Sequence, residues 1–443
     1  MTTLSFAGII IGVALFMYMA YKGYNIYFNV LIASAIIFLT DGMNPFTGWT
    51  TVFMPAFGSV AKTYILIYVL SAIYAAQMAY SGAAKALAVK ISRALKRNAK
   101  SEIATKFFAV LTMPITCAIL TYGGVSSLML TFIIVALFKE MFKELDIPWE
   151  YYCFASVGTA TFALGMMPGA PDMINVAPTT ILGTTTMAAP GIGILGSVIY
   201  LAISCWYLWR CMKKTVASGE GYLPTGSYIE AAEVKKIADG KPEHNLILCL
   251  LPPVALLVSL NIIKLNLVTS LVIANLTHAV LFFKWTNFKE CISDGATRGI
   301  GTACILTSSI AFGSVVSSVS GFETIKAGLG YLSVLPPIWT VFVATNIMAA
   351  VTASGTSAVN TTLNMFGENF LAMGLAPEAI HRVCSMTALG LNTLPNSAAM
   401  ANSTAVTKLP IPIIWKHFKW TTVVFPLVSA FVATLLVSFG LVF

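Results

Sequence analysis

The stretch Thr121-Tyr122-Gly123-Gly124-Val125-Ser126-Ser127 interrupts a long apolar segment in the first half of the chain. A similar polar break, Thr352-Ala353-Ser354-Gly355-Thr356-Ser357, interrupts an apolar segment in the second half. Each is followed by a second break that contains glycine and proline, at 163–172 and at 388–397. Interrupted apolar segments at corresponding places in two halves of a membrane protein are the best sequence indication of a transporter binding site.

The composition indicates a membrane protein. Of the 443 residues, 58% are hydrophobic and only 10% are charged, whereas a soluble globular chain carries about 25% charged residues. The net charge of +9 does not favour nucleic-acid binding, because the basic residues lie in short loops between apolar runs. The apolar run at 4–20 has no basic residues before it and no small-residue cleavage site after it, so we expect a retained helix and not a signal peptide.

Apolar runs predict the crossings of the membrane. A hydrocarbon core of about 30 Å needs roughly 20 helical residues. Runs of that length occur at 4–20, 24–40, 62–81, 192–209, 246–263, 265–283, 299–319 and 421–442. The stretches 107–138 and 334–366 are too long for one crossing, too short for two, and polar in the middle. We therefore expect two re-entrant hairpins, each returning to the side from which it entered.

The basic residues predict the orientation. Both flanks of the first hairpin are basic: Lys85, Lys90, Arg93, Lys96, Arg97, Lys100 and Lys106 precede it, and Lys139 and Lys143 follow it. Cytoplasmic loops are enriched in Lys and Arg, so this hairpin is predicted to enter from the cytoplasm. Of the 26 Lys and Arg residues, the resulting topology leaves outside only Lys62, Lys264, Lys326 and Arg382. Both termini are then predicted to be extracellular or periplasmic.

The predicted fold is an all-α polytopic membrane protein with two inverted-topology repeats, each with a re-entrant hairpin and a broken transmembrane helix. Repeat one, 1–209, contains three crossings within 4–81, a cytoplasmic hairpin at 107–138, a broken helix at about 152–188 and a helix at 192–209. The polar segment 210–245 is expected to be a cytoplasmic linker. Repeat two, 246–443, contains three crossings within 246–319, an extracellular hairpin at 334–366, a broken helix at about 382–407 and a helix at 421–442.

The polar breaks have the chemistry of an anion site. A half-helix that returns from a hairpin tip presents free N–H groups and the positive end of its dipole. Glycine allows close approach to the backbone, hydroxyls donate further hydrogen bonds, and the asparagines near the broken helices can accept from substrate hydroxyls. The predicted substrate-binding residues are Thr121, Gly123, Gly124, Ser126, Ser127, Gly169, Asn175, Ser354, Gly355, Thr356, Ser357, Asn392, Asn396 and Ser397. The alternative for each is close helix packing without a ligand role.

Charged residues near the breaks are few. Asp172 is a candidate for the coupling ion, because intramembrane carboxylates commonly relay protons; the alternative is a hydrated position at a cavity mouth. His381 and Arg382 are expected to cap or snorkel at the extracellular start of a helix. No Lys or Arg is expected deep in any break, so neutral donors and dipoles would have to hold an anion. The eight cysteines have no CxxC pairs, and no metal site or cofactor is expected.

The sequence resembles the GntP-type gluconate permease family, within the ion transporter superfamily. The resemblance is strongest at 107–190 and 335–410. It is carried by Met167-Pro168-Gly169-Ala170-Pro171 with Asn175, and by the run from Pro377 to Val383 that leads into Ala388-Leu389-Gly390-Leu391-Asn392-Thr393-Leu394-Pro395. It implies a bacterial inner-membrane symporter for gluconate or 3-hydroxybutyrate, a homodimer, and a scaffold with a transport domain that moves like an elevator. The chain departs from the pattern at Asn396, where relatives often have His, and at Asp172, where an amide is common.

The leading hypothesis is therefore proton-coupled symport of a small hydroxy-monocarboxylate or sugar acid, with membrane lipid as its environment. Sodium coupling is the nearest alternative, since Gly, Ser, Thr and Asn offer hard oxygen ligands, and an anion channel is a lower one. An enzyme is not expected, because the chain has no HExxH or GxSxG motif and no pair of carboxylates on one helix face.

Overall fold

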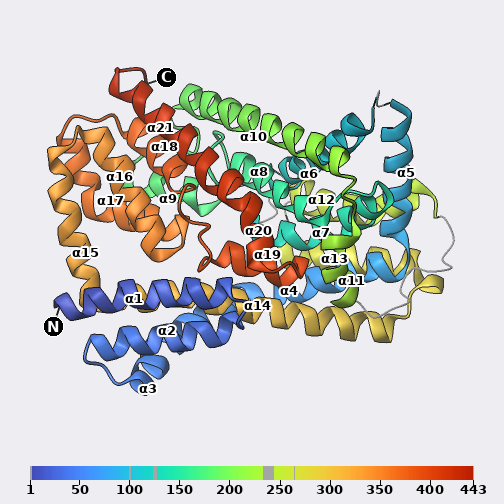
Figure 1. The fold of residues 1–443 in the computed structure, drawn as a ribbon, viewed down its shortest axis with the longest axis horizontal. Coiled ribbons are helices and arrows are strands. Elements are labelled where there is room, and N and C mark those ends of the chain that lie inside the picture. The colour runs from blue at the N-terminus through green and yellow to red at the C-terminus, as the bar shows by residue number, and fades with distance from the viewer. Residues whose placement is uncertain (1, 99–100, 123–126, 233–243, 264, 443) are drawn as a thin grey trace.

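The computed structural model describes residues 2–98, 101–122, 127–232, 244–263 and 265–442, and every regular element in these ranges is helical. Six helical segments are long and apolar enough to cross a membrane: Thr2–Tyr21, Pro45–Tyr80, Glu102–Thr121, Pro190–Ser218, Phe288–Ser318 and Ile411–Ser438. The prediction of an all-helical, multi-pass membrane protein is confirmed. Both termini lie toward the same end of the molecule (Figure 1).

One group of helices is built around the contact between two long members, α4 and α14, and we call it the first helix group. Its members are α1 (Thr2–Tyr21), α2 (Ile26–Thr40), α4 (Met54–Tyr80), α12 (Leu246–Leu257), α13 (Leu267–Leu281) and α14 (Phe288–Ser318). With 31 residues, α14 is about 46 Å long and exceeds the thickness of the hydrocarbon core. Helices α1, α2 and α14 run side by side along one edge of the molecule (Figure 1).

Two glycines allow α14 to approach α4 closely. A Cβ atom at Gly295 would lie 2.6 Å from the Cα of Ile73, and one at Gly299 would lie 2.6 Å from the Cα of Val69. No real Cβ approaches backbone this closely, so larger residues at these positions would push the helices apart. Small residues four apart are the usual means of close helix contact in membranes.

The second helix group contains two helical hairpins. In the first, α6 (Glu102–Tyr122) packs against α7 (Ser127–Glu144); in the second, α16 (Pro337–Thr352) packs against α17 (Gly355–Ala372). The turn of the second hairpin is tight, with Ala353 at a φ of +50°. Ser354 then caps α17, because its hydroxyl accepts a hydrogen bond of 3.3 Å from the backbone N–H of Ser357.

The other members of this group include two interrupted helices. Residues 149–164 are helical and end in a π-helical segment, Thr159–Leu164; an irregular stretch follows, and the helix resumes as α9 (Met173–Leu182). In the second half, α18 (Pro377–Thr387) is separated from α19 (Ala398–Thr407) in the same way. Helices α10 (Pro190–Ser218), α20 (Ile411–Phe418) and α21 (Phe425–Ser438) complete the group, and α5 (Ala83–Asn98), α11 (Leu223–Ala232) and α15 (Gly321–Gly330) are peripheral.

Several helices are longer than the apolar runs predict. The crossing expected at 62–81 begins at Pro45, and the one expected at 421–442 begins at Ile411. Polar residues in these extensions have partners: the hydroxyl of Thr51 donates to the carbonyl of Thr47, and Lys416 and His417 contact the carboxylate of Glu150. Helix α10 likewise continues to Ser218, and α11 forms within the expected linker.

Candidate functional site

A cavity of about 440 Å³ lies between the two helix groups, and we call it the central cavity. Its walls come from α4 and α14 of the first group and from both hairpins and both interrupted helices of the second. Six of the predicted site residues line it: Asp172, Ser354, Gly355, Thr356, Ser357 and Asn392. Residues from both halves of the chain therefore share one chamber.

Three helices begin at this cavity. Met173 of α9, Gly355 of α17 and Ala398 of α19 are the first residues of their helices, and all three line the wall. A side chain caps each helix: Asp172 accepts from the N–H of Ile174, Ser354 from that of Ser357, and Ser397 from that of Met400. Because a cap satisfies only one of the first N–H groups, further N–H groups at the starts of α17 and α19, and three positive dipole ends, are directed toward an anion in the cavity.

Gly355 brings the start of α17 into contact with both interrupted helices. A Cβ atom there would lie 2.5 Å from Cδ1 of Ile174 and 2.9 Å from the amide nitrogen of Asn392. Asn392 is only 9% exposed, and its amide oxygen has no hydrogen-bond partner among the described residues. A buried acceptor without a partner is costly, so this oxygen is positioned to accept from a hydroxyl of a bound molecule.

Asp172 lies at the edge of the same chamber. Its side chain is half-buried, and one carboxylate oxygen accepts the N–H of Ile174 at 3.2 Å. The start of α9 stabilises the negative charge, since anions are favoured at helix N-termini. Asp172 thus combines a capping role with access to the cavity, where it can meet a proton or a cation.

The remaining wall is hydroxylic and apolar. Hydroxyl-bearing residues that the sequence analysis did not select are also in the wall: Tyr64, Thr131, Tyr152, Ser156, Thr159, Ser309, Thr352, Thr393, Ser403 and Thr422. All of these except Thr393 lie in helical segments, where only their polarity could have indicated a site. Apolar lining residues include Leu130, Ile134, Leu164, Ile310 and Leu389. Among the described residues no Lys or Arg lines the cavity, so the positive potential comes from the helix ends.

Other predicted site residues lie away from the cavity wall. The hydroxyl of Thr121 donates to the carbonyl of Cys117 within its own helix, and Gly169 adopts a φ of +75° in the first irregular stretch. Ser397 acts through its cap, and Asn396 is buried with no partner for either amide atom in the described part of the chain. Gly123, Gly124 and Ser126 lie outside the described residues, as does the side chain of Ser127, where α7 begins.

Asn175 belongs to a polar cluster behind the cavity. Its amide nitrogen donates to the carbonyls of Ala170 and Thr186, at 2.9 and 3.1 Å. Its oxygen lies 3.1 Å from a ring nitrogen of His381 and accepts from Arg382 at 3.2 Å. In this conformation Asn175 therefore holds the interrupted helix in shape and does not face the cavity.

The position of Arg382 differs from the one predicted from the sequence. It is completely buried, so the prediction that His381 and Arg382 cap or snorkel at a surface is wrong, as is the prediction that no Arg lies deep in a break. Its guanidinium donates to the carbonyls of Ala188, Gly165 and Thr186 at 2.7 to 3.1 Å. The physical reason is that irregular backbone frees carbonyls that must be satisfied, and the planar fork of Arg can serve several of them at once.

No family model matches the chain. A protein of Bacillus subtilis (strain 168), named uncharacterized transporter YxjC, is 28% identical over 444 residues, which cover 90% of this chain and 92% of that protein. Together with six candidate spans in the described residues, this similarity is consistent with a membrane transporter. The match to the gluconate permease family stays a prediction.

Proposed function

We propose that the chain is a secondary active transporter that carries a small hydroxy-monocarboxylate or sugar acid, of the gluconate or 3-hydroxybutyrate type, into the cell together with protons. The observation that supports this most is the convergence of three helix N-termini on one cavity without a lining Lys or Arg among the described residues. Such a site suits a substrate with one carboxylate, which the helix N–H groups would bind. Asn392 and the hydroxyls of the wall would contact the neutral polar groups of the same substrate.

In this proposal the first helix group is the scaffold and the second is the transport domain. The support is that the central cavity lies between the groups, where a substrate loaded on the second group faces α4 and α14. Two inverted repeats, 1–209 and 246–443, would supply corresponding parts of each group, and a homodimer in the bacterial inner membrane would hold the scaffolds still. A carboxylate that neutralises the helix ends would lower the cost of moving the loaded domain.

Uptake into proteoliposomes tests the proposal. Purified protein should accumulate labelled 3-hydroxybutyrate or gluconate when the lumen is alkaline relative to the outside, and a protonophore should abolish accumulation. Saturation, and exchange of internal for external label, would argue against a channel. Accumulation that ignores both the pH gradient and a sodium gradient would contradict coupled transport.

Sodium coupling is the second candidate, because Asp172 and Asn392 line the same cavity and the amide oxygen of Asn392 has no hydrogen-bond partner in the part of the chain that the structure describes. Carboxylate, amide and hydroxyl oxygens are suitable ligands for a hard cation. Replacing sodium by choline at fixed pH should leave uptake unchanged under proton coupling and abolish it under sodium coupling.

Asp172→Asn is expected to remove proton-driven accumulation while leaving the fold intact. Asn is as good an N-cap as Asp, so α9 should keep its start, but an amide cannot take up a proton near neutral pH. Accumulation at a fixed pH gradient should fall to the equilibrium level, whereas exchange should persist. Glu323→Gln, which removes an exposed carboxylate on α15, is the control. Undiminished proton-driven accumulation by Asp172→Asn would show that another group carries the proton.

Gly355→Ala is expected to weaken substrate binding. The added methyl must displace Ile174 and Asn392, and overpacking of this kind typically costs about 1–3 kcal/mol, so the apparent KM for uptake should rise about tenfold. Gly367→Ala in the same helix is the matched control, because its Cβ would meet only Ile181 and Leu182 at 3.8 and 3.9 Å. Equal KM values for the two variants would exclude the start of α17 from the site.

A further inference from the structure

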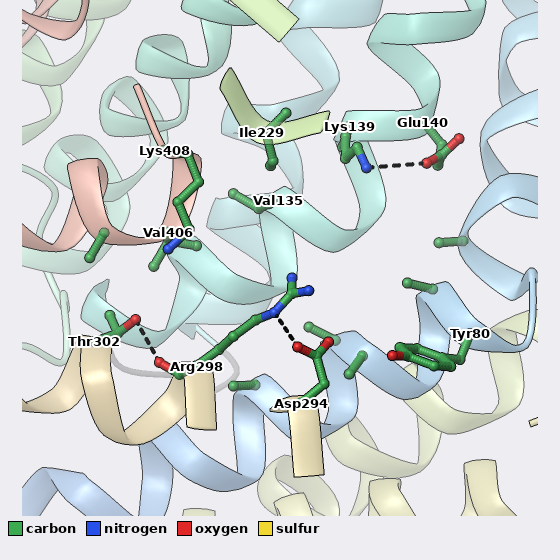
Figure 2. Close-up of a pocket in the computed structure, with 16 residues that line it drawn as sticks. Tyr80, Val135, Lys139, Glu140, Ile229, Asp294, Arg298, Thr302, Val406 and Lys408 are labelled. Atoms are coloured by element: carbon green, nitrogen blue, oxygen red, sulfur yellow. Dashed lines mark hydrogen bonds and ion pairs between the residues drawn. The ribbon is translucent and has the colours of Figure 1, made fainter. Parts of the chain in front are cut away.

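A second pocket, of about 100 Å³, contains cationic groups (Figure 2), which are absent from the described lining of the central cavity. Three cationic residues line it, Lys139 of α7, Arg298 of α14 and Lys408 at the end of α19, and we call it the basic pocket. Two acidic residues, Glu140 and Asp294, accompany them. Its wall also includes alanines of α4, which make part of it apolar.

The basic pocket and the central cavity share four helices. On α4 the lining moves from Tyr64 in the cavity to Ala72 in the pocket, which is about 12 Å along the helix. The same shift occurs from Ser309 to Thr302 on α14, and α7 and α19 also contribute to both. The two spaces therefore follow one seam between the scaffold and the transport domain. Lys139, which lines the pocket, belongs to the basic flank of the first hairpin that is predicted to be cytoplasmic. The pocket is therefore expected to lie toward the cytoplasmic side.

A thin buried layer separates the two spaces. Tyr68 and Leu306 form an apolar cluster with Val406, and all three are at most 8% exposed. The Tyr68 hydroxyl donates to Asn402 at 3.3 Å, and Asn402 in turn donates to Thr131 at 2.9 Å. An anion in the central cavity would reach the basic pocket once this layer shifts.

The charges in the pocket are unevenly paired. Lys139 lies 3.8 Å from Glu140 and 3.7 Å from Glu230. Asp294 accepts from Nε of Arg298 at 2.8 Å. This contact leaves the terminal amino groups of Arg298 directed into the pocket (Figure 2). Lys408 has no ion pair in the part of the chain that the structure describes.

Lys408 and Arg298 line the same small pocket, although like charges repel. They enter the pocket from different walls (Figure 2). Partial burial lowers the pKa of Lys408, and the charge of Arg298 lowers it further. Lys408 also holds a left-handed backbone, with a φ of +62°, where the last turn of α19 ends. A bound carboxylate between the two cations would relieve their repulsion.

We infer that the basic pocket is a second carboxylate site, in which Lys408 and Arg298 bind the transported anion after it leaves the central cavity. This inference rests on the proposed function, because it takes the same substrate class. The central cavity holds the anion by helix ends alone, whereas the basic pocket offers full positive charges toward the predicted cytoplasmic side. The anion would therefore be drawn along the seam toward release.

Equilibrium dialysis of the purified full-length protein with labelled 3-hydroxybutyrate tests the inference without depending on transport. The wild-type protein should bind at two classes of site. Lys408→Gln should weaken one class at least about tenfold, because a charge-assisted hydrogen bond is lost, and Lys408→Arg should restore it. Gly355→Ala should weaken only the other class. Lys289→Gln, which removes an exposed lysine from α14 outside the pocket, is the matched control.

Each outcome decides a different point. A single class of site that Gly355→Ala weakens and Lys408→Gln does not would overturn the second site and keep the central one. Binding that only Lys408→Gln weakens would support the basic pocket and contradict the proposed cavity. Absence of any binding would contradict both. If Lys408→Gln fails to yield folded protein, Arg298→Gln provides the same test, because it removes the other cation of the pocket and should weaken the same class of site.

Discussion

Gly299→Ala is expected to destabilise the protein strongly, because α14 packs against the backbone of α4 at this position. The new Cβ would lie 2.6 Å from the backbone of Val69, and backbone cannot move aside as a flexible side chain can. Overpacking costs about 1–3 kcal/mol, so the melting temperature in detergent should fall by roughly 5 °C. The measurement is thermal unfolding of the purified protein, followed by the fraction that remains monodisperse on size-exclusion chromatography.

Gly301→Ala provides the matched control for that change. It lies in the same helix, and a Cβ there would meet nothing within 4 Å. Because alanine is favoured over glycine inside helices by about 0.5–1 kcal/mol, Gly301→Ala should be neutral or slightly stabilising. Equal melting temperatures for the two variants would contradict close packing of α14 on α4.

Arg382→Gln is expected to abolish uptake and to lower stability strongly. The buried carbonyls of Gly165 and Ala188 would lose this donor, whereas that of Thr186 would keep its bond from Asn175. Each unsatisfied group costs about 1–3 kcal/mol, so the total should reach at least about 2 kcal/mol. Uptake should fail even in the folded fraction, because the irregular stretch that leads to Asp172 would no longer be held. Proteoliposome uptake and thermal unfolding check the two effects.

Two comparisons make the result specific to the guanidinium geometry. Arg382→Lys keeps the charge but has one nitrogen, and it should recover little stability. Arg210→Gln removes an exposed arginine that lies over the ring of Trp206, and it should change neither quantity much. Full stability and uptake in Arg382→Lys would show that charge alone suffices.

The class of the protein, a helical membrane protein, and the positions of the two helix interruptions could be predicted, because both depend on local sequence. Apolar runs long enough for a bilayer occur only in membrane proteins, and glycine with proline around Pro168 and Pro171 cannot continue a helix. Helix starts were predicted less well. Thr51, Lys416 and His417 look polar in the sequence. In the structure Thr51 bonds to a carbonyl of its own helix, and Lys416 and His417 contact Glu150, so polarity alone placed the starts too late.

The site was predicted in part for a similar reason. Ser354, Gly355 and Asn392 have a composition typical of a break, and the structure places them together at the central cavity. Arg382 could not be assigned its role from sequence, because the carbonyls that it binds lie about 200 residues earlier in the chain. Asn175 was selected for its polarity, but its bonds to that arginine and to the backbone occupy it. Hydrogen bonds between residues so far apart in the chain produce no periodic pattern in the sequence.

The contact between Tyr68 and Asn402 bears on how fast such a protein could work. Asn402 and Thr131 are both parts of the second helix group, so their shorter bond would travel with that group, while the longer 3.3 Å bond from Tyr68 would have to break in every turnover. A long hydrogen bond is a weak one. In the proposed transport cycle, this bond between the two helix groups would therefore contribute little to the barrier that opposes their movement.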